Sequence, residues 1–174
     1  MEAKHPVEKI KSNVHELVLR SKYNHVTFVW GPPGTGKTYT LARTAANKYF
    51  QKKKVLILSQ SNQAVDVLIG EVTAFVKKKG KFFEGDILRY GTNAGEALSA
   101  QSVTTMGLIE KEDPLLSQSK KNLFEERRLL KEDLNHSFSK KDYDDLLDLE
   151  NKIANLLEKF RQKELKYVQD AYII

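Results

Sequence analysis

The chain has 174 residues, of which 40% are hydrophobic and 30% charged, and it contains no cysteine. This length is enough for one modest domain with its own core, and the lack of cysteine excludes disulfides and thiolate metal sites. The histidines are scattered without the spacing of a zinc motif, and no apolar run approaches the ~20 residues that cross a bilayer. We therefore expect an intracellular, soluble, cytoplasmic protein.

The formal net charge of +6 is unevenly distributed. Acidic and basic residues balance over residues 119–170, so residues 1–118 carry the whole excess, mainly in Lys52–Lys54 and Lys77–Lys81. Such an excess can attract nucleic-acid phosphates by counterion release. Lysines of solvated loops would give the same composition, and both interpretations stay open here.

The N-terminal part predicts one helix and then alternating strands and helices. Pro6 suits the first turn of a helix, apolar residues at helical spacing follow it, and residues 21–24 end it. Short β-branched and aromatic runs then predict buried strands, and amphipathic stretches between them predict helices. The expected strands are Val26–Trp30, Val55–Leu58 and Asp86–Tyr90, and the expected helices are Lys37–Tyr49 and Asn62–Lys78. This order indicates an α/β fold with a parallel sheet flanked by helices.

The segment 119–170 differs in character and predicts a long antiparallel helical hairpin. Residues 122–134 and 142–169 contain neither glycine nor proline, and a polar stretch separates them. Apolar residues of the second arm follow an a/d heptad pattern, which indicates a short coiled-coil seam. Ordinary packing of helices against a domain remains the alternative. The seam positions are Leu146, Leu149, Ile153, Leu156 and Phe160.

The second arm is longer than the first, so its apolar residues need further partners. Leu156, Leu157 and Phe160 lie beyond the reach of an arm that begins at Asn122. Residues 98–116 or a second molecule could cover them, and we expect some self-association through the hairpin. Residues 171–174 resemble the opening of another buried strand, so we interpret the chain as a fragment of a longer protein.

A complete phosphate-loop motif, known as Walker A, follows the first expected strand. The sequence fits G-x-x-x-x-G-K-[ST] between a strand and a helix. Glycines allow the backbone to approach an anion, and the following helix start adds its partial positive charge. Lys37 is the catalytic candidate because it would reach the β- and γ-phosphates, and Thr38 would bind Mg²⁺. The expected ATP-binding residues are Gly31, Pro32, Pro33, Gly34, Thr35, Gly36, Lys37 and Thr38.

Hydrolysis requires more than this loop, and the remaining parts are not evident. No apolar strand of the sequence ends in Asp-Asp or Asp-Glu, the usual Mg²⁺ and water-positioning motif. Arg43 and Arg89 are the only arginines that we consider as an arginine finger. We therefore expect this chain alone to be inactive as an ATPase, although it binds ATP and Mg²⁺.

The order of motifs resembles superfamily 1 helicases of the Upf-like branch. That branch carries GPPGTGKT and then a Ser-Asn-x-Ala-Val-Asp segment, called motif Ia, and this chain has GPPGTGKT and SNQAVD in that order. Arg89-Tyr90-Gly91 is similar to a later Arg-x-Gly of the family, and the hairpin has the position of its helical stalk. The resemblance implies that residues 1–118 are part of a RecA-like domain of a helicase.

The same resemblance implies contacts with single-stranded nucleic acid, either DNA or RNA. Motif Ia contacts the strand backbone in that family, so Ser59, Gln60, Ser61 and Asn62 become the nucleic-acid candidates. Capping of the following helix by Ser61 or Asn62 is the structural interpretation, and both can hold together. Asp66 lies one turn into that helix, where we expect a structural role.

Two other classes of protein remain open. An AAA-type ATPase that acts on proteins also often carries GPPGTGKT, but its second acidic motif should have appeared before the end of this sequence. A non-enzymatic interaction module built around the helical hairpin would explain the balanced charges there. It would leave the phosphate loop without a role.

Overall fold

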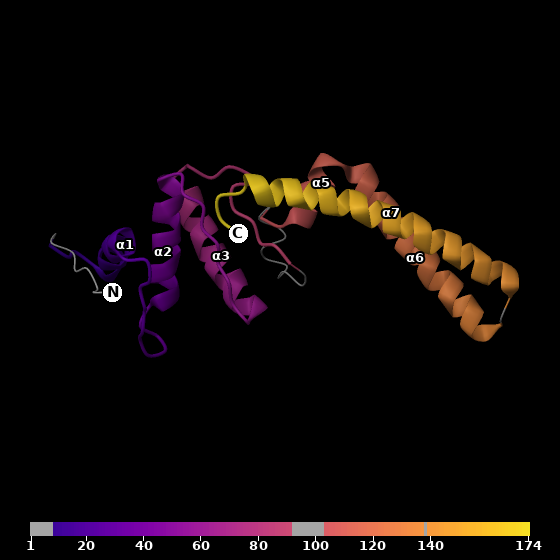
Figure 1. The fold of residues 1–174 in the computed structure, drawn as a ribbon, viewed down its shortest axis with the longest axis horizontal. Coiled ribbons are helices and arrows are strands. Elements are labelled where there is room, and N and C mark those ends of the chain that lie inside the picture. Colours follow the sequence, from indigo (N-terminus) through magenta and orange to yellow (C-terminus); the bar gives the residue numbers. More distant parts are fainter. Residues whose placement is uncertain (1–8, 92–102, 138) are drawn as a thin grey trace. The chain divides into compact units, whose positions relative to one another are not determined.

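The computed structural model describes residues 9–91, 103–137 and 139–174. The chain divides into two compact units, one made of Met1–Thr104 with Asp170–Ile174 and the other of Thr105–Gln169. The helices are α1 (Asn13–Tyr23), α2 (Lys37–Phe50), α3 (Asn62–Lys78), α5 (Thr105–Glu112), α6 (Pro114–His136) and α7 (Lys140–Asp170) (Figure 1). The first three therefore belong to the first unit, and the others build the second.

Helix α1 begins later than the sequence suggests. Ser12 is its N-cap, and the Ser12 hydroxyl accepts a hydrogen bond from the backbone N–H of His15 at 3.1 Å. The residues from Lys9 to Ser12 are not helical, and Pro6, the predicted first residue, lies outside the described residues. A serine that satisfies a free N–H of the first turn is a stronger start signal than an apolar periodicity that continues before it.

Helix α2 packs against α1 on one side and against α3 on the other. Small side chains of α2 allow the helices to approach closely, and β-branched side chains of α3 fill the contact. Residues from three extended segments complete this core. The buried residues are Ala42, Ala45, Ala46, Tyr49, Ile69, Val72, Val76, Ile87, Val103 and Ile173.

The predicted parallel sheet is wrong, because the described residues form no strands. The segment Val26–Trp30 pairs with nothing in them as a strand, and its aromatic side chains are exposed, Phe28 by 93% and Trp30 by 89%. Over residues 9–91, 103–137 and 139–174 the pairing is limited to isolated parallel bridges, at Val55–Ile173, Ile87–Ile173 and Arg89–Thr104. An apolar β-branched run predicts an extended segment, but a strand also needs a neighbouring segment that pairs along its length.

The bridges nevertheless hold the extended segments in a defined place. The backbone N–H of Val55 donates to the carbonyl of Tyr172 at 2.7 Å, and that of Leu88 donates to the carbonyl of Ile173 at 2.8 Å. Ile173 is fully buried between the segments that contain Val55 and Ile87. Residues from distant parts of the chain thus close the core beneath α2 and α3.

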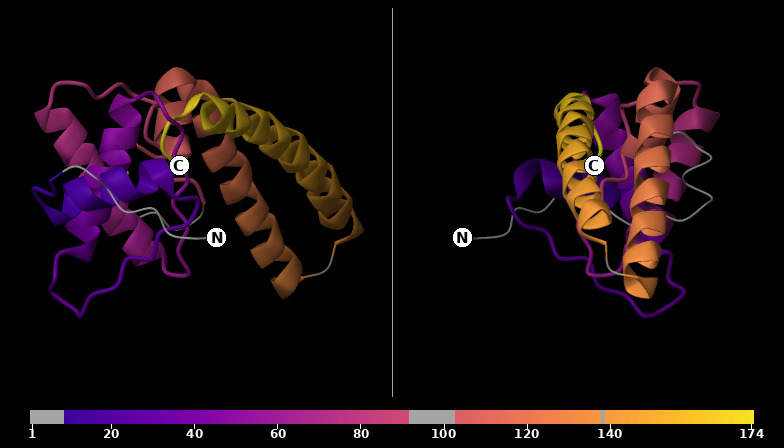
Figure 2. Two further views of the ribbon diagram at one scale, coloured as in Figure 1. Left: turned by 60° about the vertical axis from the view of Figure 1, so that its left-hand side comes forward. Right: turned by 90° about the vertical axis from the view of Figure 1, so that its right-hand side faces the viewer.

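The second unit is a hairpin whose long helices α6 and α7 run antiparallel (Figure 2). Lys131 forms an ion pair with Glu150 at 3.1 Å, and Lys120 lies 4.6 Å from the ring centroid of Phe160. Residues later in α7 therefore contact residues earlier in α6, as expected for antiparallel helices. The apolar seam of α7 faces this contact: Leu149, Ile153 and Phe160 are buried, and Leu146 and Leu156 are half-buried.

The first arm of the hairpin begins at Pro114, eight residues before the predicted start at Asn122. Asp113 caps it by accepting a hydrogen bond from the N–H of Leu116 at 3.0 Å. The two arms are therefore closer in length than expected, and Phe160 is only 4% exposed. Leu157 remains 40% exposed, so self-association through the hairpin stays a prediction.

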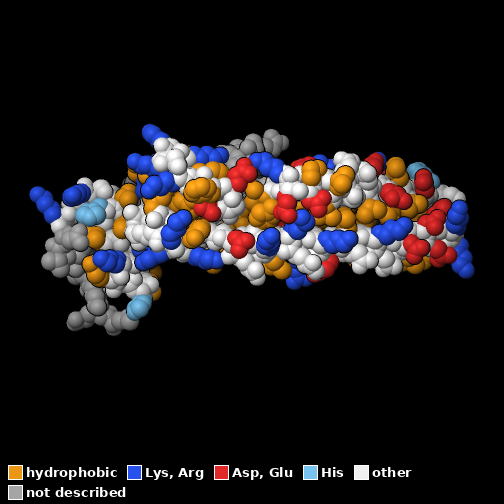
Figure 3. Space-filling model, turned by 90° about the horizontal axis from the view of Figure 1, so that it is seen from above, with side chains coloured by type: hydrophobic (Ala, Val, Ile, Leu, Met, Phe, Trp, Pro, Cys, Tyr) orange, Lys and Arg blue, Asp and Glu red, His pale blue; other side chains and the backbone are white. Residues whose placement is uncertain are grey.

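Opposite charges are interspersed along the surface of this hairpin (Figure 3). Arg128 forms ion pairs with both Glu125 and Glu132 at 2.6 Å on one face of α6. Between α5 and α7, Glu112 accepts hydrogen bonds from Lys163 at 2.9 Å and from the Tyr167 hydroxyl at 2.5 Å. The neutral balance of this segment thus reflects paired charges of neighbouring turns and helices.

These pairs predict that acid weakens the hairpin. The hydrogen bonds from Tyr167 and Lys163 lower the pKa of Glu112 below its ordinary value of 4.5, and the hydrogen bond from Lys131 does so for Glu150. A lowered folded-state pKa means that the stabilisation is complete above 4.5 and is lost as the pH falls through the folded value. We expect the melting temperature, followed by circular dichroism, to fall as the pH drops from about 5 to about 3, a range that begins just above the ordinary pKa and extends below it.

The control is the double variant Glu112→Gln, Glu150→Gln. It should start with a lower melting temperature at neutral pH and lose less of it on acidification. An equal loss in the parent and the variant would show that other carboxylates cause the acid sensitivity.

Candidate functional site

The phosphate loop needs its glycines for two different reasons. Gly34 and Gly36 have backbone φ values of 80° and 78°, which residues that carry a Cβ rarely adopt. Gly31 is crowded instead, because a Cβ there would lie 2.7 Å from the Thr35 hydroxyl oxygen. The three glycines predicted to shape the loop are therefore required by its geometry.

Lys37 folds back over the loop that precedes it. It is the first residue of α2, and its ammonium donates hydrogen bonds to the carbonyls of Gly31 at 2.5 Å and Pro32 at 2.7 Å. The positive charge is thus held inside the loop. An ammonium held by carbonyl oxygens is placed to bind other oxygens that enter the same space, such as those of a phosphate.

The remaining loop residues have different surroundings. The Thr35 hydroxyl donates to the carbonyl of Pro32 at 2.8 Å, so it closes the turn. Gly36 is the N-cap of α2 and offers no side chain to its first N–H groups, and Thr38 is exposed in the first turn. An uncapped helix start with an adjacent hydroxyl suits an anion and its bound cation.

A hollow of about 430 Å³ lies between the phosphate loop and α1. This volume falls within the usual range for small-molecule sites. Asn13, Glu16 and Arg20 line it from α1, and Trp30 and Lys37 line it from the loop side. The sequence-based prediction missed these three polar residues of α1, although their spacing of three and four places them on one helical face.

The segment that resembles motif Ia is exposed at the start of α3. The Ser61 hydroxyl accepts a hydrogen bond from the N–H of Ala64 at 3.3 Å, so the predicted cap is confirmed for Ser61. Ser59 accepts from the N–H of Ser61 at 3.2 Å, and Gln60 is exposed between them. The structure therefore brings these polar residues together at one end of a helix.

Asn62 accepts a hydrogen bond from a buried arginine. Arg89, which is 4% exposed, donates to the Asn62 side-chain oxygen at 3.0 Å, to the Asp66 carboxylate at 2.6 Å and to the carbonyl of Tyr90. The expected structural role of Asp66 is thus an ion pair. The same bonds occupy the guanidinium of Arg89, so it supports the start of α3 and is not placed to act as an arginine finger.

The other candidate finger, Arg43, packs on aromatic rings. Its guanidinium carbon lies 3.8 Å from the ring centroid of Phe75 and 4.5 Å from that of Tyr39. Tyr39, which follows the phosphate-loop motif, is about half exposed and belongs to this stack. Arg43 therefore links α2 to α3 through an aromatic contact.

A glycine loop with an inward-folded lysine beside a hollow is typical of nucleotide-binding phosphate-loop proteins. The chain belongs to the family described as "AAA domain", whose model matches residues 8–172. No solved structure matches the chain significantly. Among the described residues, no three His, Asp or Glu side chains form a metal cluster, and no helix has the length and apolar character to cross a membrane.

Two curated relatives carry helicase names. The "DNA polymerase alpha-associated DNA helicase A" of Saccharomyces cerevisiae is 26% identical over 155 residues, which cover 86% of this chain and 20% of that protein. The "Uncharacterized ATP-dependent helicase MG140 homolog" of Mycoplasma pneumoniae is 32% identical over 60 residues, or 34% of this chain and 5% of that protein. The resemblance to superfamily 1 helicases is confirmed, and the chain matches only a fifth or less of each relative.

Proposed function

We propose that this chain is the ATP-binding part of a nucleic-acid-dependent ATPase, specifically a helicase. The inward position of the Lys37 ammonium, beside an uncapped helix start, carries this proposal. The helicase names of both relatives support it. They also favour it over an AAA-type ATPase that acts on proteins, despite the wording of the family description.

The loop suits ATP with Mg²⁺ because Gly34 and Gly36 adopt positive φ values, which let the backbone curve around an anion. Backbone N–H groups at the start of α2 would bind phosphate oxygens, and Lys37 would exchange its two carbonyl partners for them. The exposed Thr38 hydroxyl is the Mg²⁺ ligand that this chain supplies. When bound, Mg²⁺ neutralises phosphate charge.

The nucleic-acid contact of the proposed site is the exposed segment Ser59–Asn62. Gln60 has the most freedom there, because Ser59 and Ser61 stabilise the turn and Asn62 is held by Arg89. Short polar side chains and backbone N–H groups suit contacts with phosphate and sugar, which position a strand without reading its sequence. Self-association through the hairpin forms no part of the proposal.

Calorimetric titration with ATP and Mg²⁺ tests the proposed nucleotide site. We expect the parent chain to bind and Lys37→Ala to bind roughly ten- to a hundredfold more weakly, because a charge-assisted hydrogen bond contributes about 1.5–3 kcal/mol. Lys141→Ala is the matched control, since it removes an exposed lysine of the hairpin. Equal affinities of the parent and Lys37→Ala would mean that the loop is not the binding site.

A further inference from the structure

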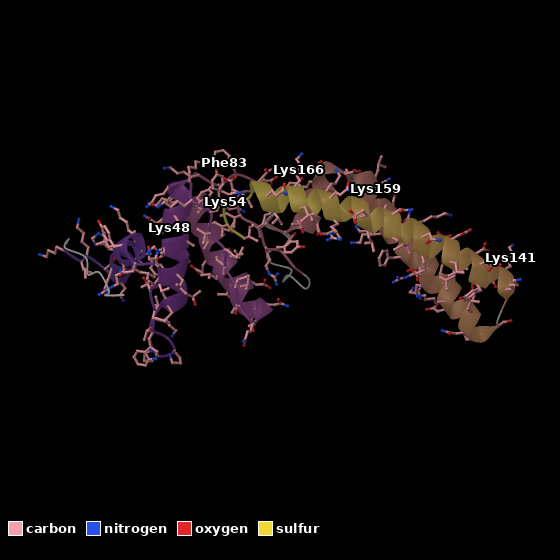
Figure 4. The ribbon with its side chains drawn as sticks, in the orientation of Figure 1. Lys48, Lys54, Phe83, Lys141, Lys159 and Lys166 are labelled. Carbon is pink, nitrogen blue, oxygen red and sulfur yellow. The ribbon has the colours of Figure 1, made fainter. Side chains whose placement is uncertain are left out.

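Eight lysines gather where α2 and α3 end. We call Lys48, Lys52, Lys53, Lys54, Lys77, Lys78, Lys79 and Lys81 the lysine patch. No acidic residue occurs between Lys48 and Lys54, and only Glu84 and Asp86 follow soon after Lys81. Figure 4 labels Lys48, Lys54 and the nearby Phe83 at this end of the helix pair.

Specific contacts join the two lysine-rich stretches into one surface. The single proton of the Tyr49 hydroxyl is shared by two acceptors, the carbonyl of Lys81 at 2.8 Å and the Asp86 carboxylate at 2.5 Å. The Lys81 ammonium lies 5.4 Å from the ring centroid of Phe50, at the end of α2. Segments about thirty residues apart in sequence, as the Tyr49–Lys81 bond shows, are therefore held side by side.

The arrangement brings like charges close together. Partial burial lowers the pKa of Lys48, and the positive charge of Lys53 lowers it further. Lysines in the last turn of a helix do stabilise its dipole, which accounts for Lys48, Lys77 and Lys78. The lysines beyond the helix ends add repulsion that an anionic ligand would relieve.

Aromatic rings lie among these lysines. Lys52 is 5.1 Å from the ring centroid of Tyr172, and Lys77 is 4.7 Å from that of Phe82. The next side chain, Phe83, is 63% exposed. Phe83 directly follows Phe82, the ring that Lys77 contacts, so an exposed ring adjoins the lysine patch. Proteins bind single strands with basic side chains near an exposed aromatic ring, because phosphates contact the charges and bases stack on the ring.

The lysine patch is separate from the proposed nucleotide and motif Ia sites. The phosphate loop and Ser59–Asn62 adjoin the starts of α2 and α3, whereas the patch lies at their ends. A helix of 14 residues, such as α2, is about 21 Å long. A ligand on the patch therefore need not touch either proposed site.

We propose that the lysine patch is a second binding surface for single-stranded nucleic acid, with lysines on the phosphates and Phe83 stacked on a base. Binding there requires no nucleotide and reads no sequence, since backbone phosphates and base faces are common to all strands. It goes beyond the proposed function, which places the strand at Ser59–Asn62.

Fluorescence anisotropy with a labelled oligothymidylate of about 15 nucleotides, without ATP, tests this surface. The triple variant Lys53→Gln, Lys78→Gln, Lys81→Gln should bind roughly tenfold or more weakly at about 50 mM salt. The salt slope, which is the slope of the logarithm of the binding constant against the logarithm of the salt concentration, should be smaller in magnitude by about 2. The matched control is Lys140→Gln, Lys141→Gln, Lys159→Gln in the hairpin, which changes the net charge equally. It should bind as the parent does.

Two further measurements identify the ligand and the place. Phe83→Ala should weaken binding at least about fivefold with an unchanged salt slope, because it removes stacking and no charge. Equal losses of affinity in the two triple variants, or an unchanged affinity of Phe83→Ala, would overturn the proposal. So would tighter binding of an acidic peptide than of the oligonucleotide.

Discussion

Replacing Arg89 by methionine should lower the free energy of unfolding by about 3–5 kcal/mol, the usual effect of breaking a buried ion pair. Arg89 is 4% exposed, and its guanidinium bonds to Asp66 and Asn62 of α3 and to the carbonyl of Tyr90. Methionine fills much of the same space but leaves these acceptors without their donor. Urea unfolding of the parent and of Arg89→Met measures the difference.

The matched control is Arg128→Met on the exposed face of α6. Arg128 forms two ion pairs at 2.6 Å, as short as the pair between Arg89 and Asp66, but the side chains of these pairs are exposed. We expect no measurable loss of stability there, because exposed pairs contribute little. Similar losses in both variants would contradict a special role for the buried arginine.

The substitution Gly36→Val should have the second large effect, a loss of affinity for ATP. Gly36 has a φ of 78° at the N-cap of α2, a conformation that costs a residue with a Cβ roughly 1–2 kcal/mol. The variant loop should relax away from this conformation when free and must return to it to surround the phosphates. Its affinity for ATP should therefore fall about five- to thirtyfold.

Gly80→Val is the control for backbone strain alone. Gly80 has a φ of 64°, and an added Cβ meets nothing within 4 Å at either position. Both variants should thus lose similar stability in urea unfolding, whereas only Gly36→Val should lose affinity in calorimetric titration. Unchanged ATP affinity of Gly36→Val would mean that nucleotide binding does not depend on the conformation of the loop at Gly36.

The local features of the candidate site could be read from the sequence. The helices that follow the phosphate loop and the motif Ia segment begin where predicted, at Lys37 and Asn62. Glycine spacing, a serine cap and apolar periodicity act within one or two turns of chain, so neighbouring residues reveal them. The same holds for the apolar seam of α7.

Contacts between distant residues could not be read in this way. Arg89 and Asp66 are 23 residues apart, and their pairing exists only because α3 packs beside the segment that contains Arg89. The hollow beside the loop likewise depends on where α1 packs against α2. The contact of Arg43 with the ring of Phe75 also joins two helices.

The sequence by itself determined the phosphate loop, the starts of α2 and α3 and the family to which the chain belongs, because each depends on residues close together in the chain. Tertiary structure alone decided which of the expected strands pair with another segment and which do not. Val26–Trp30 has the apolar character of a strand yet lies exposed, while Ile173 is buried between Val55 and Ile87. Pairing along an extended segment depends on which distant segment lies beside it, and no local preference specifies that neighbour.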